Sequence, residues 1–168
     1  MTVILGVDPG LQRTGWGIIT SKDNSLSYVA CGVIKSTASL PLPERLKQLH
    51  DGLMAIVQAH HIDEAALEET FVNNNAASAL KLGHARGAVC LALSLANLPV
   101  YEYSATMVKK SVVGKGHADK NQVGMMVRTL LPQSKAESAD SADALAVSIC
   151  HAHHRSFSSS LRKQGSGI

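Results

Sequence analysis

The alternation of short apolar segments with breaker residues limits the possible folds of this chain more than any other feature. Glycine, proline, asparagine and aspartate separate segments that have the length of a strand or of a helix. Alternation and turn signals predict strands at residues 3–7, 15–20, 26–36, 64–69 and 100–104. Helical spacing predicts a first helix that begins near Pro43. It also predicts four further helices, over 78–97, 105–113, 119–131 and 138–154. Three leading strands followed by alternating helices and strands predict an α/β fold, a five-stranded mixed sheet flanked by helices.

The length and the apolar content suit one domain. With 168 residues, 45% of them hydrophobic, the chain can bury a sizeable core, and we expect a domain over 1–154 and a polar, disordered tail over 155–168. The longest apolar run, 88–98, contains Ser94 and Asn97, and no basic leader precedes the first strand, so we expect no membrane span and no secretory signal. Three widely spaced cysteines suit a reducing compartment, which predicts a cytoplasmic protein.

Four carboxylates lie beside apolar segments, where an unpaired charge is costly to bury. Asp8 follows the first strand, Glu68 lies at the end of the fourth, and Asp140 and Asp143 lie three residues apart in the last helix. A set of acids without cysteine or histidine favours Mg²⁺ or Mn²⁺ over zinc. Acid-only sites of this kind suit phosphoryl transfer, with two cations about 4 Å apart on the scissile phosphate. The four acids therefore predict a metal-dependent enzyme.

Each acid also has a simpler interpretation when it is taken alone. The sequence Asp8-Pro9-Gly10 is a good turn, and Ser138 or Asp140 could cap the last helix. Neighbouring strand residues point to opposite faces, so alternation leaves open whether Glu68 or Glu69 faces the site. The rival metal cluster of His151, His153 and His154 is weaker, because it lies at a helix end without a spaced partner.

The positive charge is concentrated in one loop region and in the tail. Residues 109–120 hold four lysines against one aspartate, and 155–168 hold three basic residues, although the formal net charge of the chain is only +3. A basic loop on an otherwise acidic body is typical of a polyanion-binding protein, and a solvated surface loop is the alternative. The lysines are Lys109, Lys110, Lys115 and Lys120.

Several stretches together resemble the RuvC family of Holliday-junction resolvases. The main ones are LGVDPG at 5–10, LEETF at 67–71, NAASALKLGHARG at 75–87 and DSADALA at 140–146. The stretches 112–120 and 126–131 are also similar, so the resemblance covers about residues 1–153. It implies a ribonuclease H-like fold, a homodimer, and an endonuclease of recombination and repair. It further implies Mg²⁺-dependent nicks in two opposed strands of a four-way DNA junction.

The resemblance also assigns residues. By position, the catalytic and metal-binding acids of the family are Asp8, Glu68, Asp140 and Asp143. The family glutamate lies three residues before a phenylalanine, and this spacing selects Glu68. We expect two Mg²⁺ per site, with Mn²⁺ able to substitute.

The same carry-over predicts the DNA contacts. Phe71 matches a family aromatic near the junction centre, and a core position after the strand is its alternative. Lys109 and Lys120 match basic positions that face phosphate, and Lys115 belongs to the same basic loop. We expect a branch-migration complex to present the junction.

The second helix predicts how two copies associate. Gly83 and Gly87 lie on one of its faces, and from Ala88 onward it is apolar nearly all round. A two-fold dimer with one site per subunit suits paired cuts, so we expect this helix in the dimer interface. Two alternatives remain: a ribonuclease H-like nuclease on another nucleic acid, and a junction-binding protein that does not cut.

Overall fold

The fold is built on a five-stranded sheet. A computed structural model describes residues 1–69 and 75–164, with side chains up to Arg155. The strands are β1 (Thr2–Asp8), β2 (Arg13–Lys22), β3 (Ser25–Lys35), β4 (Glu64–Glu68) and β5 (Val100–Tyr103), in the order β3-β2-β1-β4-β5. The first three strands pair antiparallel, whereas β4 runs parallel to β1 and β5 parallel to β4. The predicted mixed sheet is confirmed.

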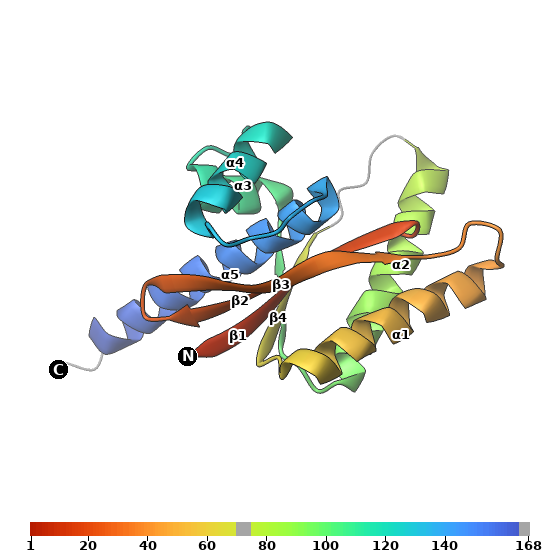
Figure 1. The fold of residues 1–168 in the computed structure, drawn as a ribbon, viewed down its shortest axis with the longest axis horizontal. Coiled ribbons are helices and arrows are strands. Elements are labelled where there is room, and N and C mark those ends of the chain that lie inside the picture. Colours follow the sequence, from red (N-terminus) through yellow and green to blue (C-terminus); the bar gives the residue numbers. More distant parts are fainter. Residues whose placement is uncertain (70–74, 165–168) are drawn as a thin grey trace.

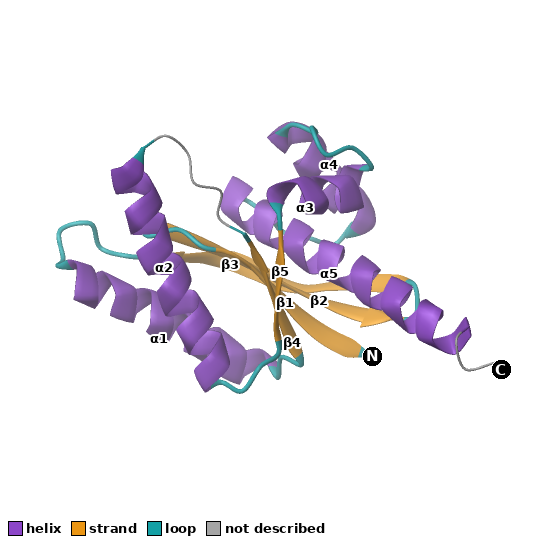
Figure 2. Cartoon of the chain, turned by 180° about the vertical axis from the view of Figure 1, so that it is seen from behind, coloured by secondary structure: helices purple, strands orange, loops and turns teal. Residues whose placement is uncertain are grey.

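The helices cover both faces of this sheet. Figure 1 shows α1 (Leu42–His60) and α2 (Ala76–Leu95) together on one side and α5 (Ala139–Gln164) on the other. The two short helices, α3 (Ala105–Val113) and α4 (Lys120–Leu130), pack beside α5, and the view from behind shows the same layers (Figure 2). Local sequence defines where these short helices begin: Ser104 caps α3, and Asp119 and Gln122 form a capping box at α4.

The core is divided by the sheet into two buried layers. Successive residues of β1 face opposite layers. Ile4 therefore packs with α5, whereas Leu5 and Val7 pack with the α1–α2 side. The α5 layer is unusually close to the sheet at Gly6, where an added Cβ would lie 2.1 Å from the carbonyl oxygen of Ala144. A side chain at this position would push the last helix away from β1.

The last helix is longer than the sequence indicated. We expected it to end near His154, but α5 continues to Gln164, inside the segment for which we expected a disordered tail. Residues 155–164 contain neither proline nor glycine, so no residue there interrupts the helical hydrogen-bond pattern, and Gly165 is the first glycine that follows. Residues 165–168 lie outside the described part of the chain. Across the helices that the structure describes, none has both the length and the apolar character needed to cross a membrane.

Candidate active site

Two parallel strands bring the first two acids together. Val7 of β1 lies opposite Leu67 of β4, so both strands end at the same edge of the sheet, with Asp8 next to Glu68. Both carboxylates line a pocket of about 200 Å³. Glu69, which alternation did not separate from Glu68, is exposed.

The pocket has both charged and apolar lining residues. Asp143, Lys109 and Lys120 line it together with Asp8 and Glu68, and its apolar lining residues are Ala105, Val108, Val123 and Ala146. Of the predicted acids, Asp140 is the one that does not line this pocket.

The start of α5 is held against the sheet by a glycine. Gly15 of β2 lies directly opposite Asp8 of β1, and a Cβ on Gly15 would lie 2.1 Å from the backbone oxygen of Asp140. Ser138 caps the helix, because its Oγ accepts a hydrogen bond from the Ser141 amide at 3.2 Å. The missing side chain at Gly15 therefore allows the backbone of Asp140 to lie against β2, at the residue paired with Asp8 of β1.

The carboxylates raise one another's proton affinity. Burial raises the pKa of Asp8 to about 7, and the negative charges of Glu68, Asp143 and Asp140 add to this effect. Burial also raises the pKa of Glu68, with Asp143 as the next cause, and the pKa of Asp143, which Lys120 partly offsets. The local lysines thus supply too little positive charge to keep these acids at their ordinary acidity.

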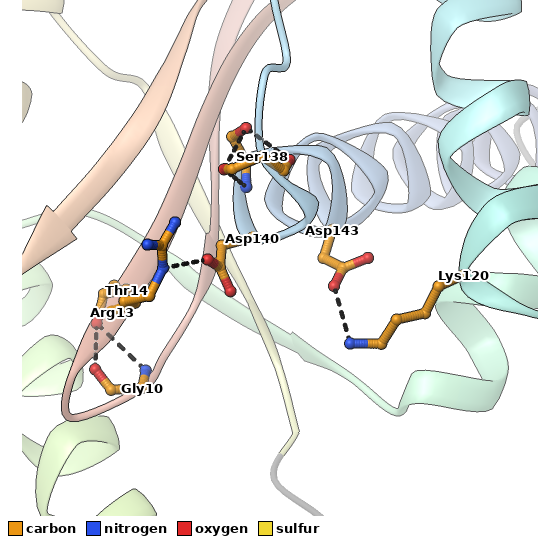
Figure 3. Close-up of polar contacts among 8 residues, drawn as sticks. Gly10, Arg13, Thr14, Lys120, Ser138, Asp140 and Asp143 are labelled. Carbon is orange, nitrogen blue, oxygen red and sulfur yellow. Dashed lines mark hydrogen bonds and ion pairs between the residues drawn. The ribbon is translucent and has the colours of Figure 1, made fainter.

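Two basic side chains pair with the α5 acids. Figure 3 shows Asp140 directed at Arg13 of β2, with Nε 2.7 Å from Oδ2, and Asp143 directed at Lys120 of α4, with Nζ 3.9 Å from Oδ2. The Lys120 side chain is 80% exposed, so its contact is loosely held.

The chemical type of the donor atoms suits a hard divalent cation. Carboxylate oxygens are the ligands that Mg²⁺ and Mn²⁺ prefer, and the raised pKa of Asp8 marks a deficit of positive charge. Within the described residues, however, no three His, Cys, Asp or Glu side chains are gathered closely enough to hold an ion as they stand. A cation would therefore require Asp140 or Asp143 to turn from its present basic partner.

Three residues that support the site were not singled out in the sequence. Arg13 pairs with Asp140, and Thr14 Oγ1 donates to the Gly10 carbonyl at 2.8 Å and so closes the turn after Asp8. Arg86 of α2 donates to the Glu68 carbonyl at 2.9 Å and thereby fixes the end of β4. The available signal for Arg13 was its position as a basic residue between Asp8 and the strand predicted at 15–20.

The predicted DNA contacts are placed unequally. Lys109 and Lys120 reach the pocket, whereas Lys115 is exposed in the loop between α3 and α4 and does not line it. Phe71 lies outside the described residues. The rival histidine group does not form one cluster of ligands, since His151 is buried against Glu64 and Tyr103.

Comparison with known proteins decides the family. A family model described as "Crossover junction endodeoxyribonuclease RuvC" matches residues 4–151. The chain belongs to the RuvC family. The RuvC of Paramagnetospirillum magneticum is 64% identical over 152 residues, covering 90% of this chain and 92% of that protein. The RuvC of Rhodospirillum rubrum is 56% identical over 166 residues and covers 98% of both chains.

Solved structures give the same assignment. The structure of T. thermophilus RuvC in complex with Holliday junction substrate has a TM-score of 0.88 and 32% identity, covering 94% of this chain and 97% of that one. The yeast mitochondrial Holliday junction resolvase, at 15% identity and a TM-score of 0.61, shares the fold. The predicted ribonuclease H-like fold is confirmed, and membership of the RuvC family makes the protein an endonuclease.

Proposed function

We propose that this protein resolves Holliday junctions by paired, metal-dependent nicks in two opposed strands during homologous recombination and DNA repair. The observation that carries this proposal is the pocket in which Asp8 lies with Glu68 and Asp143, with a pKa for Asp8 of about 7. A site with this excess of acid suits a cationic cofactor together with an anionic substrate such as a phosphodiester. The RuvC relative solved with junction DNA supports the substrate.

In this proposal Asp8, Glu68, Asp140 and Asp143 are the catalytic acids and hold Mg²⁺, two ions per site, with Mn²⁺ as a substitute. When held by these acids, divalent cations would supply activation of the attacking water and positive charge opposite the phosphate. The residues of the chain orient the reaction: the ends of β1 and β4 fix Asp8 and Glu68, and the first turns of α5 present the other two acids.

The substrate strand would be held by basic residues on the α3–α4 side. Lys109 and Lys120 line the pocket and are placed for phosphates near the scissile bond. Lys115, exposed in the adjoining loop, would contact the backbone further away. Phe71 is proposed as a group that stacks on bases near the junction centre.

A second copy of the chain would supply the second cut. Leu80, Leu91 and Leu95 of α2 are exposed, and an added Cβ would meet nothing within 4 Å at Gly83 or Gly87. An exposed apolar helix face of this kind suits a two-fold interface. We propose a homodimer through α2, in the cytoplasm, with a branch-migration complex as the partner that presents the junction.

The test is cleavage of 5′-labelled synthetic four-way junctions with Mg²⁺, beside linear duplex and RNA–DNA hybrid of the same sequence. The proposal predicts symmetric nicks in two opposed strands of the junction and no comparable cleavage of the two controls. Preferred cleavage of the hybrid would assign a different nuclease activity. Tight junction binding without any cleavage would instead indicate a non-cleaving binding protein.

A further inference from the structure

Arg13 occupies the side of the site that is opposite the lysines. It is the first residue of β2, whereas Lys109 and Lys120 belong to α3 and α4. Its Nε lies 2.7 Å from Oδ2 of Asp140, the predicted acid that lies outside the catalytic pocket. Arg13 is therefore the cation that neutralises Asp140 in the protein without DNA.

The backbone at Arg13 is held by its neighbours, whereas its side chain is open to solvent. Arg13 is paired with Lys35 of β3, and the next residue, Thr14, is buried and bonded to both the amide and the carbonyl of Gly10. The side chains of the ion pair are 42% and 34% exposed, and an ion pair open to water is weak. The guanidinium can thus change partner by rotation of the side chain alone.

The free end of Arg13 is suited to a phosphate. The ion pair uses Nε, and Figure 3 shows the two terminal nitrogens directed away from Asp140. A guanidinium carries five donors in a planar fork that matches phosphate geometry better than an ammonium does. A strand held by Lys109 and Lys120 on one side would therefore meet Arg13 on the other.

We propose that Arg13 is a positioning residue that exchanges Asp140 for a phosphate of the junction strand, and so releases the Asp140 carboxylate to the cation when DNA is bound. Without DNA, the positive charge of Arg13 competes with the cation for Asp140. With DNA, that charge is taken up by the strand. Binding of the strand and binding of the cation are then coupled, and either must favour the other.

The inference rests on the proposed function, and its test separates the two. Junction binding is measured in EDTA over a series of KCl concentrations, and Mn²⁺ binding is measured by electron paramagnetic resonance on the full chain without DNA. The variants are Arg13→Gln, Arg13→Lys and, as a matched loss of one charge at the other end of β2, Lys22→Gln. Thermal melts check that each variant is folded.

For Arg13→Gln we expect two changes. The slope of log K against log salt becomes shallower by about 0.9, the contribution of one phosphate contact. Mn²⁺ binds several-fold more tightly to the DNA-free protein, because the competing cation has been removed. Arg13→Lys should keep the salt slope of the wild type, and Lys22→Gln should keep both properties.

A wild-type salt slope in Arg13→Gln would overturn the phosphate contact. Mn²⁺ binding that is unchanged or weaker in Arg13→Gln would overturn the exchange, because a purely structural ion pair would not tighten metal binding when it is lost. Failure of the wild type to nick junctions would count against the proposed function. If the wild type nicks junctions normally and Arg13→Gln has the salt slope and the Mn²⁺ affinity of the wild type, the result would count against this inference alone.

Discussion

Two groups of charged side chains lie along α5, and their carboxylates differ in how far the chain neutralises them. At the start of the helix, Asp140 and Asp143 lie near the strand ends that carry Asp8 and Glu68, and we call these four acids the carboxylate cluster. Two turns further along, Glu64 at the beginning of β4 lies beside His151 and Arg155 of α5. Strand β4 thus contributes one acid to each group, whereas α5 contributes two acids to the first group and two basic side chains to the second.

The second group, which we call the histidine cluster, is made of Glu64, Tyr103, His151 and Arg155. His151 is 1% exposed, with Nε2 2.7 Å from Glu64 and Nδ1 2.8 Å from the Tyr103 hydroxyl. Burial lowers the pKa of His151, against the opposing effect of Glu64, and burial raises the pKa of Tyr103 to about 12. The ring is therefore neutral, donates through Nε2, and accepts from a hydroxyl that stays protonated.

The comparison teaches how to separate structural acids from functional ones. Glu64 has two nitrogen partners within 2.7 Å, so its charge is satisfied by the chain itself. The pKa of Asp8 is raised to about 7 by burial and by three neighbouring acids, and the opposing effect of Lys120 is smaller than any of these. A partly buried acid that the fold leaves without counter-charge is the one that requires an external cation.

The largest expected effect comes from Asp8→Asn. This change removes a ligand from the cation site, and the loss of several kcal/mol of transition-state stabilisation corresponds to about a 10³-fold fall in nicking rate. Junction binding should be kept or tightened, because a negative charge near phosphate is removed. Nicking at the wild-type rate on labelled junctions would show that Asp8 is not part of the catalytic site.

A change in the histidine cluster should lower the stability of the fold and leave metal binding unchanged. His151→Ala leaves the Tyr103 hydroxyl and one side of Glu64 without a partner and opens a cavity, so we expect a loss of about 3 kcal/mol in the free energy of unfolding. Urea denaturation measures this loss, and Mn²⁺ binding by the folded fraction should stay as in the wild type. His153→Ala, at an exposed position of the same helix, is the control and should cost under about 0.5 kcal/mol.

Much of this contrast was present in the sequence, but not all of it. Asp8 and Glu68 end apolar segments, and Asp140 and Asp143 open one, so their positions at strand ends and in the first turns of the last helix were predictable from pattern. The choice of Glu68 over Glu69 was not, because residues on opposite faces of a strand are equivalent until the packing of the sheet is known. It came from the resemblance, and the structure puts Glu68 in the pocket and Glu69 in solvent.

The partners of the acids were the least predictable part. Arg13 and Asp140 are 127 residues apart, and Glu64 and His151 are 87 apart, so no local spacing relates them. From the sequence, Glu64 is only the first residue of a predicted strand, and His151 belongs to a weak candidate metal cluster. Both pairs depend on how α5 lies across the sheet. Glycines of the sheet, where α5 crosses it, allow this close approach.

Moving one end of α5 should therefore damage one cluster and spare the other. Gly15→Ala places a Cβ against the Asp140 backbone, and we expect overpacking to cost about 2 kcal/mol while it displaces the acids of α5 from Asp8. Denaturation and nicking are both measured. Gly124→Ala in α4 is the matched control, because its Cβ would meet only the flexible end of Arg128 at 3.7 Å, and it should not be destabilised. Equal stability of the two variants would contradict the close approach at Gly15.

The smallest effect is the pH dependence of stability that Asp8 contributes. The pKa of Asp8 is about 7 in the folded protein and close to 4 in an unfolded chain, so between these values the folded state binds the extra proton. The contribution of Asp8 to stability without metal is therefore greatest below pH 4 and falls as the pH rises from 4 through 7. The contribution of Asp8 is about 1.4 kcal/mol between pH 6 and pH 8. Urea denaturation in EDTA should show this fall in the wild type and a much flatter profile in Asp8→Asn. Saturating Mg²⁺ should remove the difference between the two pH profiles, because the cation takes the place of the proton. Parallel profiles for the two proteins in EDTA would contradict this prediction. They would mean that Asp8 is already neutralised by the chain, as Glu64 is.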